Sequence, residues 1–64
     1  MSLKALRANV NLSQDVVAER LGISRQSYRS KENGKSQLTL KEAWILSDLF
    51  NTSLEVICIA VGLV

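Results

Sequence analysis

The sequence predicts an all-α fold in which five short helices form one compact domain over residues 1–64. Residues that cap or end helices divide the chain into segments of about seven to twelve residues, in which apolar residues recur with a period of about 3.6. No segment shows sustained strand-like alternation before the C-terminal end. A chain of 64 residues, 47% hydrophobic and 22% charged, has a globular composition with room for one small core.

Two helices are predicted in the N-terminal third. The first covers residues 2–9 and ends near Asn11, because Asn tolerates the left-handed backbone conformation that follows a helix. The second covers residues 14–21, begins after the N-cap Ser13, and ends at Gly22, the residue type that most readily adopts a positive φ. The residues that these helices turn toward the core are Leu3, Leu6, Val10, Val17, Ala18 and Leu21.

Two further helices are predicted in the middle of the chain. The third covers residues 25–33, with Ser24 as its N-cap and Gly34 at its end. Thr39 caps the fourth helix, and Glu42 three residues later completes a capping box. The core-facing residues expected on the fourth helix are Leu40, Ala43, Leu46 and Phe50.

Asn51 ends the fourth helix, and Ser53 begins a fifth that continues into an apolar tail at residues 54–64, LEVICIAVGLV. Nine of these eleven residues are apolar and many are β-branched, so the end of the tail could be helix or strand. Leu54 and Ile57 are expected to complete the core.

The rest of the tail has little to pack against within one chain, so a second copy is its simplest cover. Packing of the fifth helix against its mate is favoured, an exchanged strand is the alternative, and a frayed or truncated end would need no partner. The residues predicted to dimerise are Trp44, Ile57, Ile59, Val61 and Leu63.

The residue inventory argues against an enzyme. The chain has no His and one cysteine, Cys58, so it lacks the ligands of a zinc site and cannot form an intrachain disulfide. Glycine-rich phosphate loops are absent, and the closest acids, Asp15 and Glu19, look like a solvated helix face. We expect no catalytic residue, cofactor or metal. With no signal-peptide pattern and no apolar run of about 18 residues, a cytoplasmic protein without a membrane partner is expected.

Positive charge is concentrated in residues 25–35. This stretch carries +3, compared with +2 for the whole chain. A solvated helix face and a phosphate-binding strip would both show such an excess, so charge alone leaves both interpretations open. The charged residues of the stretch are Arg25, Arg29, Lys31, Glu32 and Lys35.

Residues 14–34, QDVVAERLGISRQSYRSKENG, have the spacing of a helix-turn-helix. Ala18 lets two helices approach, and Gly22 supplies the turn. Ile23 and Tyr28 then join apolar residues of the preceding helix in a small core. On a helical wheel the polar side chains of the second helix face outward, opposite Tyr28, at Arg25, Gln26, Arg29, Ser30 and Asn33.

Four short motifs follow one another at fixed spacing, namely LSQ at 12–14, LG at 21–22, SRQ at 24–26 and ENGK at 32–35. On these motifs the chain resembles the Cro/CI-type (XRE) helix-turn-helix family of phage repressors and bacterial regulators, over about residues 3–57. The resemblance implies a lambda-repressor-like five-helix domain, with its helix-turn-helix at about residues 14–33, that binds DNA and regulates transcription.

The resemblance also implies roles for individual residues. Gln14 matches a phosphate-contacting position at the start of a helix. Asn33 and Lys35 match positions near the DNA backbone, although Asn33 has an equal alternative role in ending its helix. The base-reading positions are matched by Arg25, Gln26 and Arg29. Ser27 and Ser30 could contact bases or backbone. The full predicted contact set is Gln14, Ser24, Arg25, Gln26, Ser27, Arg29, Ser30, Asn33 and Lys35.

The chain departs from the family pattern at a few positions. Lys31 stands where relatives usually carry Trp, Leu or Ile; its aliphatic stem is expected to cover the same surface while its ammonium reaches solvent or phosphate. Several residues are apolar where the family is often polar, so Trp44 either completes the core or marks a partner surface. These residues are Val16, Trp44, Ile45 and Leu49.

The predicted function is therefore a phage-repressor-like regulator that binds a pseudo-palindromic DNA operator as a homodimer. The two recognition helices would enter successive major grooves ~34 Å apart. An antitoxin or a restriction–modification controller fits the same fold. The alternative from another class is a protein-interaction module that kept the fold and lost DNA binding.

Overall fold

The computed structural model describes residues 2–62, and in that range the chain forms five helices and no strand. The predicted all-α fold is confirmed. The helices are α1 (Leu3–Asn9), α2 (Gln14–Leu21), α3 (Arg25–Glu32), α4 (Leu40–Leu49) and α5 (Leu54–Ala60).

Side-chain caps fix where the helices begin. Before each helix a hydroxyl accepts a hydrogen bond from the backbone N–H three residues on, which satisfies one donor that the helix itself leaves free. Thr39 and Glu42 form the predicted capping box at the start of α4. The five caps are Ser2, Ser13, Ser24, Thr39 and Ser53.

Residues with positive φ follow the helices. Asn11 and Asn51, predicted to stop the first and fourth helices, have φ of 57° and 52°. Gly22 is the left-handed C-cap of α2, as predicted. The third helix ends one residue earlier than predicted, because Asn33 is its C-cap and Gly34 then takes a φ of 79°. These local signals set the element boundaries.

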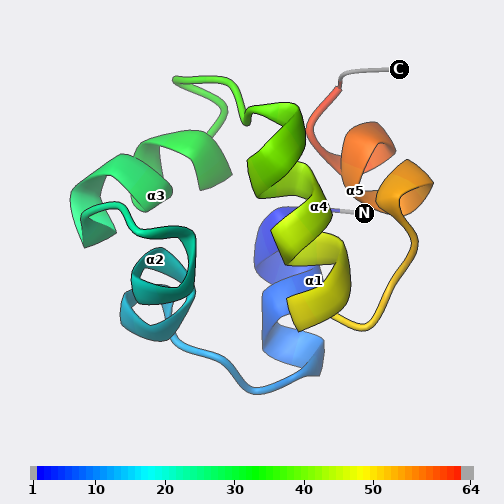
Figure 1. The fold of residues 1–64 in the computed structure, drawn as a ribbon, viewed down its shortest axis with the longest axis horizontal. Coiled ribbons are helices and arrows are strands. Elements are labelled where there is room, and N and C mark those ends of the chain that lie inside the picture. The colour runs from blue at the N-terminus through cyan, green and yellow to red at the C-terminus, as the bar shows by residue number, and fades with distance from the viewer. Residues whose placement is uncertain (1, 63–64) are drawn as a thin grey trace.

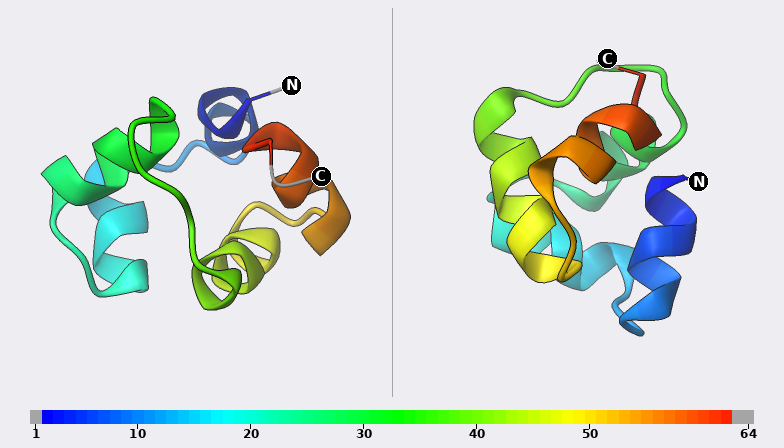
Figure 2. Two further views of the ribbon diagram at one scale, coloured as in Figure 1. Left: turned by 90° about the horizontal axis from the view of Figure 1, so that it is seen from above. Right: turned by 90° about the vertical axis from the view of Figure 1, so that its right-hand side faces the viewer.

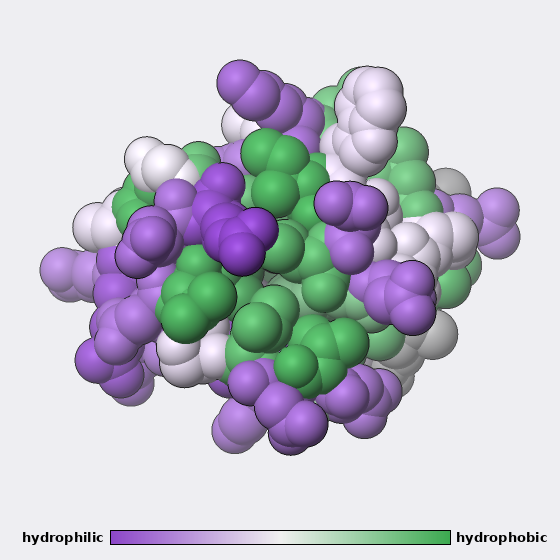
Figure 3. Space-filling view, turned by 60° about the horizontal axis from the view of Figure 1, so that its bottom comes forward, coloured by the Kyte–Doolittle hydropathy of each residue, from purple (hydrophilic) through white to green (hydrophobic). Residues whose placement is uncertain are grey.

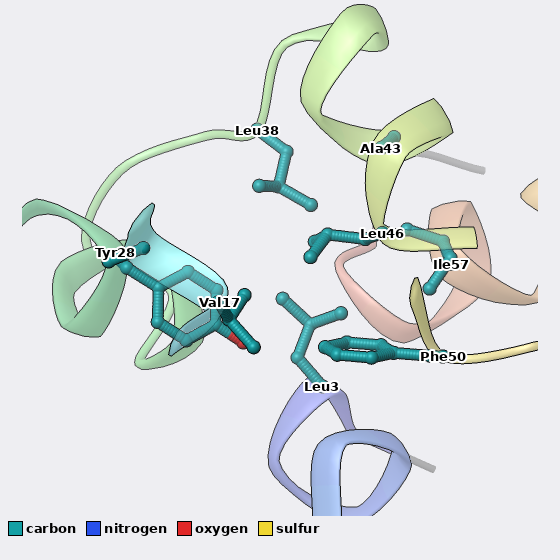
Figure 4. Packing of buried hydrophobic residues seen from close by; sticks show 9 residues of the cluster. Leu3, Val17, Tyr28, Leu38, Ala43, Leu46, Phe50 and Ile57 are labelled. Carbon is teal, nitrogen blue, oxygen red and sulfur yellow. The ribbon is translucent and has the colours of Figure 1, made fainter. Parts of the chain in front are cut away.

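The helices are arranged so that α2 and α3 lie together at one end of the molecule and α5 lies at the other (Figure 1). α4 packs against both α2 and α5 and so joins the two ends. Figure 2 shows α1 and α4 on opposite sides of the molecule, and residues of both helices belong to one hydrophobic core. Leu3, Val17, Tyr28, Leu46 and Ile57, from five different helices, meet in this core (Figure 4).

Two core positions differ from the sequence expectation. Leu54, expected to complete the core, is 37% exposed and lies outside it. Leu40 is 68% exposed, and Leu38 is buried instead. Leu38 precedes the N-cap Thr39, and Ala43 on the first turn of α4 is also buried, which is the placement of a hydrophobic staple. The loop between α3 and α4 therefore contributes to the core (Figure 4).

The apolar tail is helical through Ala60, so the alternative of a strand is wrong for residues 54–60. Ile57 is completely buried within one chain, so the prediction that it also dimerises is wrong, because it has no surface for a second copy. Val61 is half-buried against the core, whereas Ile59 is exposed. Leu63 lies outside the described residues.

Among the described residues no single helix is long and apolar enough to cross a membrane. α4 and α5 reach the length and apolar composition of a membrane span only when they are counted together, and the chain bends by 114° between them.

Candidate nucleic-acid interface

The turn between α2 and α3 fixes how α3 is presented. At Gly22 the backbone has a φ of 73°, and the Ile23 N–H donates to the Ala18 carbonyl at 3.0 Å. Val17 on α2 and Tyr28 on α3 are both fully buried. Because Tyr28 is held in the core, the opposite side of α3 must face solvent.

That outward side of α3 carries the predicted base-reading residues. Arg25, Gln26 and Arg29 are exposed and together line one shallow hollow. Ser27 is exposed and its hydroxyl accepts from Ser24, whose own oxygen caps the helix, while Ser30 is half-buried. The structure therefore brings these residues together on one exposed surface, and their contacts with DNA stay a prediction.

A second hollow of about 400 Å³ opens beside α3 toward the starts of α1 and α2. It joins Arg25 and Arg29 to Gln14 and Asn33, four residues of the predicted contact set. It also includes Lys4, which is not among the contact residues predicted from the sequence. The i,i+3 spacing of Lys4 and Arg7 on one helix face was the available signal, but only the tertiary fold places that face next to α3.

Glu32 lines this hollow, although its side chain is only 3% exposed. Its Oε2 accepts hydrogen bonds from Arg7 Nε at 2.9 Å and from the Tyr28 hydroxyl at 2.8 Å. Its Oε1 accepts from Gln14 Nε2 at 2.9 Å and from the Arg7 guanidinium at 3.2 Å. One carboxylate thus ties α1, α2 and α3 together.

The ionisation of this cluster follows from its contacts. Burial opposes the charged form of Glu32, but the hydrogen bonds from Arg7, Gln14 and Tyr28 outweigh it, so the pKa of Glu32 is lowered. The hydrogen bond to Glu32 raises the pKa of Arg7. Burial, helped by the carboxylate, raises the pKa of Tyr28. At neutral pH the cluster is an ion pair with a neutral phenol.

The network changes what Gln14 offers to a ligand. Its side-chain amide donates to Glu32, which uses one of the two N–H donors of that amide. Gln14 is also the first residue of α2, where backbone N–H groups point out of the helix and attract anions. The second amide N–H and the backbone N–H groups at the start of α2 both remain available to an anion, and the phosphate contact of Gln14 stays a prediction.

Two predicted contacts lie at the end of α3. Asn33 is the C-cap of α3, which is one of its two predicted roles, and it is exposed in the hollow that also contains Arg25 and Arg29, where its contact with DNA stays a prediction. Lys35 is exposed in the loop that follows, with its backbone N–H bonded to the Ser30 carbonyl. Arg25 reaches Asp15 on α2 at 3.5 Å, in a pair whose side chains are 64% and 68% exposed.

Lys31 does not behave as the sequence suggested. Its stem is covered, but its Nζ donates to the Gln37 carbonyl and pairs with Glu42, both at 3.0 Å. The expectation that the ammonium reaches solvent or phosphate is wrong, because the loop between α3 and α4 folds back over it. Lys31 instead connects α3 to the capping box of α4.

Two helices joined by a glycine turn, with a basic polar face on the second, define a helix-turn-helix protein. The profile of the helix-turn-helix family matches residues 3–57. The chain belongs to this family, in its Cro/CI-type (XRE) branch, a family of DNA-binding transcription regulators. Among the described residues, no group of His, Cys, Asp or Glu is placed to hold a metal ion.

Two archaeal proteins are similar to this chain over 53 residues, which is 83% of its length. One, an uncharacterized HTH-type transcriptional regulator of Methanocaldococcus jannaschii, is 40% identical and is covered over 80% of its length. The other, an uncharacterized HTH-type transcriptional regulator of Archaeoglobus fulgidus, is 35% identical and is covered over 75%. No solved structure gives a significant match.

Proposed function

We propose that this protein is a sequence-specific transcription regulator that binds a pseudo-palindromic DNA operator as a homodimer, with α3 of each copy in the major groove. The observation that carries this proposal is the exposed side of α3, where Arg25, Gln26 and Arg29 share one surface opposite the buried Tyr28. If this face of α3 were only solvated, there would be no reason for long hydrogen-bonding side chains to be grouped next to a second hollow lined by cations.

The residues of this surface have distinct chemical roles. The guanidinium groups of Arg25 and Arg29 suit guanine O6 and N7, and the amide of Gln26 suits adenine N6 and N7. Ser24, Ser27 and Ser30 are short hydroxyl residues that can bond either base edges or the nearby backbone.

Phosphate contacts surround this base-reading surface. The backbone at Gln14, the Asn33 amide and the Lys35 ammonium hold the DNA backbone on the two sides of α3. Lys4 joins them, because it lines the same hollow as Arg25 and Arg29. These contacts set affinity and register without reading sequence.

A homodimer binds DNA more tightly than a single copy can. A net charge of +2 gives weak long-range attraction to DNA, so a second half-site contributes most of the useful affinity. The exposed apolar residues Trp44 on α4 and Ile59 on α5 mark two alternative surfaces for the contact between copies. Bound at a promoter in the cytoplasm, such a dimer represses by occluding it.

The test is selection of bound sequences from randomised duplex DNA, followed by fluorescence anisotropy on the selected and a scrambled duplex. Arg25→Ala should weaken binding to the selected duplex by ~1–3 kcal/mol and relax one position of each half-site. Arg25→Lys is the matched control, because it keeps the charge and loses the bidentate fork. It should keep affinity for scrambled DNA and lose the base preference.

Equal losses on both duplexes would contradict the base-reading role of Arg25. Failure to select any sequence, with the protein folded, would favour the alternative of an interaction module without DNA binding.

A further inference from the structure

The exposed side of α4 is unusually apolar for a helix on a single small domain. Trp44 is 70% exposed and Leu40 is 68% exposed, so the interpretation in which Trp44 completes the core is wrong. Seen from below, the molecule shows hydrophobic side chains gathered across the middle of one face and bordered by hydrophilic ones (Figure 3). A hollow of about 510 Å³ lies between α2 and α4, lined by Arg20, Lys41, Trp44, Ile45, Asp48 and Leu49.

The residues on this side of α4 are symmetric about the point between Trp44 and Ile45. Moving outward from that point, Lys41 is matched by Asp48, and Leu40 is matched by Leu49. With a rise of about 1.5 Å per residue, Lys41 and Asp48 each lie ~5 Å from the centre. If two such helices pack antiparallel across a two-fold axis, Lys41 therefore faces Asp48 of the partner subunit, and Trp44 faces the partner's Ile45.

We propose that two copies of this chain dimerise through antiparallel packing of α4 on α4, with Trp44 and Ile45 at the two-fold axis and Lys41 paired with Asp48 of the partner subunit. The proposal rests on the homodimer of the proposed function and names its interface. The partner's Trp44 packs on Ile45 and enters the hollow between α2 and α4, which is the anchor-in-pocket arrangement of an interface hot spot.

The charges of this face are available for such a contact. In the described part of the chain Lys31 pairs with Glu42 and Arg25 with Asp15, whereas neither Lys41 nor Asp48 takes part in an ion pair. Two symmetric charge pairs at the rim add little affinity, but they select the antiparallel register and disfavour the parallel one, which would oppose like charges.

This interface leaves the DNA-binding surface free. In the left view of Figure 2, α3 lies at one end of the molecule, while α4 lies along an adjacent side with its outer face turned away from the core. Neither hollow that contains Arg25 and Arg29 includes a residue of α4. Both copies of α3 therefore remain exposed when α4 is covered.

Charge exchange in the intact chain tests the register directly. Lys41→Asp and Asp48→Lys each place two like-charge contacts in the homodimer, so sedimentation equilibrium without DNA should show a dimer dissociation constant raised about tenfold or more for each. An equimolar mixture of the two variants, and the double variant Lys41→Asp/Asp48→Lys, should both regain the wild-type constant. Glu55→Lys, an exposed charge reversal on α5, is the matched control and should leave it unchanged.

Trp44 provides a second readout because it is the only tryptophan in the chain. Its emission should shift to shorter wavelength as concentration passes through the dimerisation range, since the indole leaves water. Trp44→Ala should raise the dissociation constant on the order of 30-fold, and Ile59→Ser should leave it unchanged.

The inference is overturned if the mixed charge variants stay monomeric, if the single variants remain dimeric, if Trp44 emission does not change, or if Ile59→Ser dissociates the dimer and Lys41→Asp does not. Sequence selection with wild-type protein reports separately on the proposed function. Specific DNA binding without an α4 dimer overturns only this interface, and an α4 dimer that selects no DNA sequence overturns only the DNA-binding proposal.

Discussion

α3 and α4 each have one buried side and one exposed side, but the exposed side of α3 is polar and that of α4 is largely apolar. Each helix is anchored by a fully buried residue, Tyr28 in α3 and Leu46 in α4. Opposite these anchors, α3 presents arginine and glutamine, whereas α4 presents Trp44 and Leu40. The buried side decides how a helix sits, and the exposed side decides whether it suits a polar groove or an apolar partner.

The two helices are also held to the domain in different ways. α4 is fixed by apolar packing and by the capping box of Thr39 and Glu42. α3 is fixed on one side by Tyr28 and at its end by the carboxylate of Glu32, which collects four hydrogen bonds from other helices and from Tyr28. An ionic cluster thus orients α3, whereas apolar packing and a helix cap hold α4.

The largest effect is expected from Glu32→Ala. Removal of this carboxylate leaves the Arg7 guanidinium, only 15% exposed, without its partner, and breaking a buried pair in this way costs ~3–5 kcal/mol. The free energy of unfolding of a domain of this size is rarely more than ~3–5 kcal/mol, so circular dichroism of the variant should show a largely unfolded chain.

Thr39→Ala is the control on α4, because it removes the N-cap and no ion pair, and it should cost only ~0.5–2 kcal/mol in urea unfolding. If Glu32→Ala lowered the free energy of unfolding no more than Thr39→Ala, the ionic cluster would have no special role in holding α3.

Acid should weaken the α3 attachment before it weakens the apolar core. The pKa of Glu32 is lowered in the folded chain, so its contribution is fully present above the unfolded-state value of ~4.3 and is lost as pH falls through the folded-state value. The urea concentration at the unfolding midpoint, measured from pH 7 to pH 3, should therefore decrease once the pH is below about 4.3. Glu32→Gln, which cannot ionise, should show a flatter pH profile with a lower midpoint at pH 7.

Lys4→Ala and Lys35→Ala should weaken DNA binding without changing sequence preference. Each removes one phosphate contact per copy, so the slope of log K against log salt should fall by about one per monomer for either variant. Gln26→Ala is the contrast, because it should relax a base preference and leave the slope unchanged. An unchanged slope for Lys4→Ala would place Lys4 outside the DNA contact.

The sequence predicted the helices well because their boundaries depend on local chemistry. Ser13, Gly22 and the pair Thr39–Glu42 act within a few residues of themselves, and the structure places each as expected. The outward side of α3 was predictable for the same reason, since the apolar residue Tyr28 alone indicates which face of α3 is buried.

What the sequence did not reveal depends on contacts between distant segments. Glu32 looked like one charge among several, yet its partners Arg7 and Gln14 lie 25 and 18 residues away. Lys31 seemed free for phosphate until the following loop brought the Gln37 carbonyl and Glu42 to it. Trp44 was ambiguous because its helix had two apolar sides, and only the core packing decides which one is covered.

The smallest effect is expected from Asp15→Asn, at the point where α2 touches the side of α3 that we propose reads DNA. The Arg25–Asp15 pair is highly exposed, and Asp15 also lies in the first turn of α2, so its loss should lower stability by less than ~1 kcal/mol. Affinity for DNA should change in the opposite direction, because Arg25 is released and a negative charge leaves the surface that approaches phosphate. We expect roughly two- to fivefold tighter binding to specific and scrambled duplexes alike, measured by anisotropy at two salt concentrations. Weaker binding to the specific duplex alone would show instead that Asp15 holds Arg25 in its reading position, which would make the exposed pair a positioning contact.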